Sequence, residues 1–270
     1  MSRRSSEQLV TLIIHKSNLI SDLLDDISLK KFPSTNPKTL IKIIGAICIA
    51  LKEHTLKLYK DNPTLDSEDT ENELKLIISV LFAMAPDIRF IEGASSQRIP
   101  WSLVKPFEGF SKTIPKHQDI DIILRPQWHY NFTIRRSLLK GYRESLKNIL
   151  SGDIYANIFD NTPREIYIIS FPGIEKTNIL LQSILGHELG HPFATDYLAR
   201  EDETKYLTEI RDDVETILDA KEPLQREAQR SLIIGLVKKI RNESLNEIIS
   251  DLIAVHLFRF AVIFSAYELA

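Results

Sequence analysis

Only one cysteine occurs among the 270 residues of this chain, at position 48 in the apolar run IIGAICIAL. A single cysteine cannot form an internal disulfide, which excludes the disulfide-stabilised class of small secreted domains. We therefore expect a cytoplasmic protein. Because its neighbours are apolar, Cys48 is interpreted as a small buried hydrophobic residue and not as a nucleophile.

The chain also lacks an excess of charge of either sign. It has 34 lysine and arginine residues against 37 aspartate and glutamate residues, which gives a formal net charge of -3. A chain this balanced has no general attraction for nucleic acid or for acidic lipid. We therefore expect no nucleic-acid partner.

Long uninterrupted apolar runs are absent as well. The N-terminal MSRRSSEQLV is not followed by the apolar segment and cleavage site of a secretory signal. The most apolar stretch, 252–270, is interrupted by His256, Arg259 and Glu268, and an arginine in the middle of a bilayer is costly. We predict a buried helix there and no membrane span. Since this stretch reaches the last residue without a polar tail, we expect the chain to be part of a longer protein.

The order of the patterns along the chain predicts its fold class. Hydrophobic residues make up 43% of the sequence, enough for a substantial core. Apolar residues recur at helical spacing in the first third, short β-rich segments follow, and the last third is again helical. This order predicts an α+β fold. The polar, turn-rich segment 61–72 is the best candidate linker, and it separates an N-terminal helical region, 1–66, from a second domain, 67–270.

The individual elements are predicted from periodicity and from turn residues. In chain order we expect helices over 6–30, 38–60 and 71–85; a short strand at DIRFIEG, 87–93; a loop with a short helix over 95–115; a strand, a turn and a strand over 119–134; a helix over 135–152 with Gly152 as its C-cap; a strand at EIYIISF, 165–171; a helix from about Thr177 or Asn178; and almost continuous helix from 201 to 270.

The segment LLQSILGHELGHPFATDYL, residues 180–198, contains two histidines and a glutamate spaced H-E-x-x-H. Residues i and i+4 project from one face of a helix, so His187 and His191 can bind one ion through their imidazoles. Zinc accepts such nitrogen ligands. Glu188 lies one residue further round, where its carboxylate can take a proton from an activated water and return it to a leaving group.

The residues around the motif support a buried metal-binding helix. Apart from Glu188, the residues over 183–190 that flank the histidines are uncharged. Gly186 and Gly190 are four residues apart, which predicts that a strand or a second helix approaches this helix closely. Pro192 directly follows the second histidine, and a proline there removes an N–H and crowds the carbonyl of Glu188. We expect the helix to end or kink at that point.

A catalytic zinc usually has three protein ligands, and no third histidine follows His191 at a suitable spacing. The later segment ESLNEIISDLIAVHLF, 243–258, places Glu247 and Asp251 one helical turn apart among apolar residues. Carboxylates on a buried face need a partner. We predict that Glu247 is the third ligand and that Asp251 accepts the free N–H of a ligand imidazole.

Other side chains near the site are interpreted as structural. Glu243 stands at the expected start of its helix, where the positive helix end accounts for a carboxylate. His256 is half a turn away from the face of Glu247. The acidic run 209–222 offers rival carboxylates, but among so many charges it is more simply a solvated helix face.

With these residues identified, the chain resembles the gluzincin branch of the zincin metallopeptidases. His187-Glu-Leu-Gly-His191 followed after 55 residues by Glu247-Ile-Ile-Ser-Asp251 is most similar to the group that holds the HtpX-like and CAAX-prenyl endopeptidases. The resemblance covers about 165–260. The chain departs from that group in lacking its multiple membrane helices. The resemblance implies a mostly helical zincin-like fold with a small mixed β-sheet next to the active-site helix, a zinc cofactor, and Glu188 as general base.

The resemblance also implies a peptide or protein substrate. Such a substrate would add as a strand to a sheet edge near the metal, for which DIIL and RPQWHYNFTI are the candidates. Two alternatives stay open: a catalytically silent zincin-like module that binds a partner, and a zincin scaffold in a larger protein in which 1–66 recruits partners. The cleft-lining candidates are Trp128, His129 and Tyr130, and the candidates for stabilising an oxyanion are Tyr197, His129, Tyr130, Arg259 and Tyr267.

Overall fold

The chain forms two compact units, Met1–Asn178 and Ile179–Ala270, in an α+β fold that is mostly helical. The predicted division at residues 66 and 67 falls within the first unit. The computed structural model describes residues 3–61, 67–113, 120–137, 139–160, 162–163, 165–178, 183–201, 208, 210–212, 214–216, 223–259 and 261–262.

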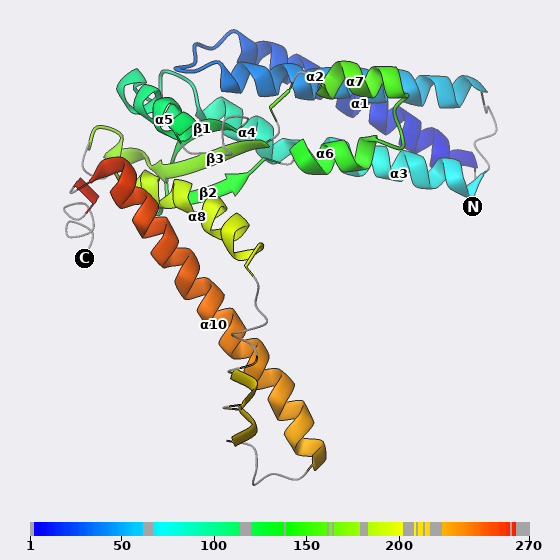
Figure 1. The fold of residues 1–270 in the computed structure, drawn as a ribbon. Coiled ribbons are helices and arrows are strands. Elements are labelled where there is room, and N and C mark those ends of the chain that lie inside the picture. The colour runs from blue at the N-terminus through cyan, green and yellow to red at the C-terminus, as the bar shows by residue number, and fades with distance from the viewer. Residues whose placement is uncertain are drawn as a thin grey trace. The chain divides into compact units, whose positions relative to one another are not determined.

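The first unit begins with a helical layer (Figure 1) in which α1 (Arg3–Ser28) packs against both α2 (Asn36–Asp61) and α3 (Glu68–Ala83). These helices confirm the three predicted from periodicity. Ser67 caps α3, since its side chain accepts a hydrogen bond from the Thr70 backbone N–H at 3.1 Å.

Cys48 lies inside this helical layer, on α2. It is 0% exposed, and burial raises the pKa of its thiol to about 12. A thiol with so little thiolate character is a poor nucleophile. The structure therefore confirms Cys48 as a buried apolar residue.

The segment DIRFIEG is a helix and not the predicted strand. It forms most of α4 (Ala85–Gly93), and Met84 is the single residue between α3 and α4. Pro86 and Asp87 suit the first turn of a helix. Ile88 and Ile91 are both buried at a spacing of three residues, which is one face of a helix and incompatible with the alternation of a strand.

A small mixed sheet follows, with the order β1-β3-β2. The central strand β3 (Glu165–Pro172) pairs in parallel with β1 (Ile120–Gln127) and antiparallel with β2 (Thr133–Arg136). The predicted strands over 119–134 and 165–171 are therefore confirmed, and both β1 and β2 are edges of the sheet. The other elements of this unit are α5 (Trp101–Thr113), α6 (Leu139–Leu146), α7 (Gly152–Phe159) and the 3-10 turn η1 (Gly173–Glu175).

The helix predicted over 135–152 is much shorter in the structure. The segment 135–152 contains only the short α6, and Gly152 is the first residue of α7 and not a C-cap. The α7 helix itself was not predicted, because its sequence GDIYANIF is too short to show a clear period.

The second unit consists mainly of α8 (Ile184–Leu198) and the long helix α10 (Pro223–Phe258), which lie against one another (Figure 1). The α8 helix begins at Ile184 and not at Thr177 or Asn178, which belong to the turn after η1. Within the part of the chain that the structure describes, none of the helices combines the length and apolar character needed to span a bilayer.

The predicted helix over 252–270 is described only in its first part. Ala254 is fully buried, whereas Leu252 is 63% exposed in this structure. Burial is therefore confined to one side of α10. Residues 263–270 lie outside the described residues.

Candidate metal centre

Two glycines bring α8 and α10 into close contact. A Cβ atom on Gly190 would lie 2.6 Å from the Cα of Ser250, and one on Gly186 would lie 2.6 Å from a ring carbon of Phe258. Ser250 and Ala254 are both 0% exposed at this crossing. The close approach predicted from the spacing of the two glycines is confirmed.

Gly190→Ala should therefore destabilise the protein. The added methyl group meets backbone atoms of Ser250 that cannot rotate away, and overpacking of this kind costs about 1–3 kcal/mol. Gly235→Ala is the matched control, because it lies in the same helix pair with nothing within 4 Å of its Cβ position and should be stabilising by up to about 1 kcal/mol. The free energy of unfolding from denaturant titration compares the two; equal effects would contradict the tight crossing.

We predicted that α8 ends or kinks at Pro192, and the helix does not end there. The helix continues to Leu198, and Pro192 is buried within it. The next turn is held by Thr195, whose hydroxyl donates to the carbonyl of His191 at 2.9 Å. Both histidines lie on one helical face because they are four residues apart and precede the proline.

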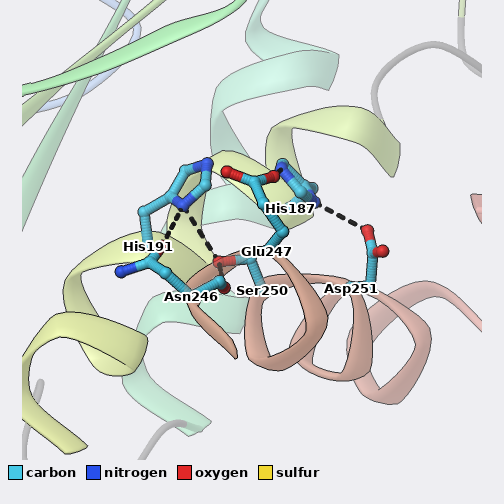
Figure 2. A network of polar contacts seen from close by, with 6 residues as sticks. All are labelled: His187, His191, Asn246, Glu247, Ser250 and Asp251. Carbon is cyan, nitrogen blue, oxygen red and sulfur yellow. Dashed lines mark hydrogen bonds and ion pairs between the residues drawn. The ribbon is translucent and has the colours of Figure 1, made fainter. Parts of the chain in front are cut away.

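The crossing of α8 and α10 brings His187, His191 and Glu247 together (Figure 2). One ligand atom from each lies within 4.8 Å of the others, so the three side chains form a group that could hold a metal ion. His187 Nε2 is 3.2 Å from Glu247 Oε2. Two ligands at tetrahedral positions around zinc are separated by about 3.3 Å, so this pair already has a suitable spacing.

Each histidine is held through its other nitrogen. His187 Nδ1 is 2.8 Å from Asp251 Oδ1, and His191 Nδ1 is 2.6 Å from Asn246 Oδ1 and 3.1 Å from the Ser250 hydroxyl. When Nδ1 donates its proton to such an oxygen, Nε2 keeps its lone pair for a metal. Figure 2 shows both Nε2 atoms turned toward the Glu247 carboxylate. The donor set of two neutral imidazoles and one carboxylate is one that zinc accepts.

Asn246 and Ser250 were not identified from the sequence. Asn246 donates from Nδ2 to the Thr195 hydroxyl at 3.2 Å, which orients its amide oxygen toward His191. Ser250 also donates to the Asn246 carbonyl at 2.8 Å. The signal was present, since both are polar residues four apart in an apolar segment, but only the position of α8 shows that they face a histidine.

The prediction that Glu247 and Asp251 lie on a buried helix face is wrong. The side chains of Glu247 and Asp251 are 62% and 66% exposed, so they do not lie on a buried face. The buried row of α10 is formed by Ser250 and Ala254, which contact the glycines of α8. The two carboxylates flank that row, and from there they reach the histidine rings.

The rival residues are not part of the candidate ligand group. Glu243 is 67% exposed and forms an ion pair with Lys239 at 3.8 Å, and His256 is exposed. Within the acidic run 209–222, Arg211 and Asp212 are exposed and Glu215 pairs with Arg230, while much of that run lies outside the described residues.

The remaining site candidates are spread over both units. Glu188 is half-buried on α8 directly after His187. Tyr197, near the end of α8, is 63% exposed. Trp128, His129 and Tyr130 are exposed residues of the β1–β2 connection in the first unit, and Tyr267 lies outside the described residues.

A groove of about 510 Å³ opens beside the candidate ligands, between the C-terminal half of α8 and α10. Its lining reaches Glu247 itself and combines apolar with polar side chains. The lining residues are Thr195, Leu198, Ala199, Lys238, Asn242, Glu243, Asn246 and Glu247.

Comparison of this chain with protein-family models, with curated proteins and with solved structures found no match. The three-residue group and the side chains that orient it are therefore the basis for the function considered below.

Proposed function

We propose that this protein is a zinc-dependent metallopeptidase that hydrolyses peptide bonds. The observation that supports this most is the orientation of the two histidines. Both rings are held at Nδ1 by side chains of α10, which leaves both Nε2 atoms directed at Glu247. A histidine needed only for packing has no use for such an arrangement on two neighbouring rings.

His187, His191 and Glu247 would hold the zinc ion. When bound, zinc supplies a positive charge that lowers the pKa of a water molecule toward about 7 and polarises a substrate carbonyl. Asp251 and Asn246 act on the ligands: each accepts the Nδ1 proton of one histidine, which fixes the tautomer and raises the basicity of Nε2.

Glu188 is assigned as the general base. It follows His187 on α8, and its carboxylate would take a proton from the attacking water and then protonate the leaving amine. A metal site that serves only stability does not require this carboxylate. The groove beside Glu247 offers space for part of a peptide substrate.

The purified chain should cleave an unfolded protein such as casein, and a metal chelator should stop the cleavage. Re-addition of zinc should restore cleavage, because the chelator stops the reaction only by removing the ion. Gel electrophoresis and mass spectrometry of the products provide the measurement. Chelator-insensitive cleavage would contradict the proposal. Zinc binding without any cleavage would favour the catalytically silent module.

A further inference from the structure

A second cluster of charge lies in the first unit, on one face of the sheet. The guanidinium carbons of Arg125 on β1 and Arg135 on β2 are 4.2 Å and 4.9 Å from the ring centroid of Phe90 on α4. Both arginines are half-buried. Arg89, the neighbour of Phe90 on α4, adds a third positive charge that acts on Arg125.

The register of the sheet explains why the two arginines meet. Arg125 is paired with Ser170 of β3, and Arg135 is paired with Ile168, two residues earlier on the same strand. Residues two apart on a strand point to the same face, so both side chains project toward α4. Arg125 is further held by Ser170, because its Nε donates to the serine hydroxyl at 3.0 Å.

These arginines have no acidic partner among the described residues. Arg136, the next residue on β2, points to the opposite face and pairs with Glu165 at 3.7 Å, whereas Arg89, Arg125 and Arg135 form no ion pair with any described carboxylate. The charges of Arg125 and Arg135, which are half-buried, repel one another, and each loses part of its hydration. Burial lowers the pKa of Arg125, and the charges of Arg135 and Arg89 lower it further.

We propose that Arg125 and Arg135, with Arg89, form a binding site for a phosphate-type oxyanion. Guanidinium groups donate paired N–H groups that match the oxygens of a phosphate, and stacking on Phe90 together with the Ser170 contact orders them before an anion binds. A doubly charged anion compensates a cluster of several cations better than a single carboxylate does. All residues of this anion site lie in the first unit, whereas the candidate metal ligands lie in the second.

Calorimetric titration of the full chain with inorganic phosphate and with pyrophosphate tests the site, with acetate titrated at matched ionic strength. Pyrophosphate should bind saturably and more tightly than acetate. Arg125→Gln and Arg135→Gln should each weaken binding by about tenfold or more, since each removes a charged, forked donor. Arg135→Lys should fall between Arg135→Gln and the parent, because lysine keeps the charge and loses the fork.

Arg136→Gln is the matched control, since it removes the same group from the same strand on the opposite face and should leave anion binding unchanged. Circular dichroism confirms that each variant is folded; if Arg125→Gln does not fold, the Arg135 variants decide the result. Absence of saturable pyrophosphate binding would overturn the proposal. So would equal affinity for acetate, or an equal loss in Arg136→Gln.

Discussion

Glu247→Ala is expected to lose zinc more severely than any other single change on α10. Glu247 Oε2 is the only carboxylate oxygen in the group of candidate ligands among the described residues, 3.2 Å from His187 Nε2. Alanine removes that ligand and leaves two imidazoles, and a two-ligand site falls short of the three protein ligands of a catalytic zinc. The expected loss of affinity exceeds about 100-fold, the upper range for changes that act through a ligand's hydrogen-bond partner.

Asp251→Ala and Asn246→Ala should each weaken zinc binding by about 10–100-fold. Neither side chain belongs to the candidate ligand group; each holds one histidine at Nδ1, at 2.8 Å and 2.6 Å. Without these acceptors the imidazoles can rotate and change tautomer. Zinc affinity then falls although all three ligands are still present.

Glu243→Ala is the control for this series. It removes a carboxylate one turn before Glu247 on the same helix, with a similar exposure of 67%, and it lies outside the ligand group. Competition for zinc against a chromogenic chelator measures all four variants. A silent Glu247→Ala, or Glu243→Ala as the most damaging change, would place the third ligand elsewhere and would withdraw the gluzincin resemblance, while the two histidines would remain candidates.

Glu188→Gln should keep zinc and lose hydrolysis. Glutamine has nearly the same shape as glutamate, but its amide cannot accept a proton from water at neutral pH. General acid–base groups contribute about 10²–10⁴-fold to rate, so cleavage of a casein-like substrate should fall by that factor while zinc content stays equal to that of the parent.

The comparison of zinc content with turnover makes this test specific. A variant that loses both zinc and activity would indicate that Glu188 supports the site and not the chemistry. Full activity in Glu188→Gln would exclude the assigned mechanism. A helpful internal comparison is Glu247→Ala, which should lose both together.

The long helices and the β-rich segments could be predicted because their periodicity is local. The apolar spacing over α1, α2 and α3 identifies each helix without reference to its partners. The DIRFIEG segment could not be assigned in this way, because in a stretch of seven residues a buried Ile88–Ile91 pair and an alternating strand give similar patterns. There Pro86 and Asp87 were the better indicators.

The three residues that could hold a metal ion were predicted from the sequence. The argument for Glu247 was only partly right, because it assumed a buried carboxylate. His187 and His191 follow from spacing on one helix, and Glu247 and Asp251 from their spacing on another. Their exposure depends on which side of α10 packs on α8, and this is set by the two glycines that admit Ser250 and Ala254. The role of Asn246 depends on the same crossing, so no local pattern could have assigned it.

The direct test of the central claim is the metal content of the chain purified without added metal. Our account predicts close to one zinc per chain, with thermal stability that falls when zinc is removed, because the ion binds only the folded protein. The double change of His187 and His191 to alanine should abolish both. A parent protein that is folded and free of metal, with a thermal midpoint unaffected by zinc, would contradict the account.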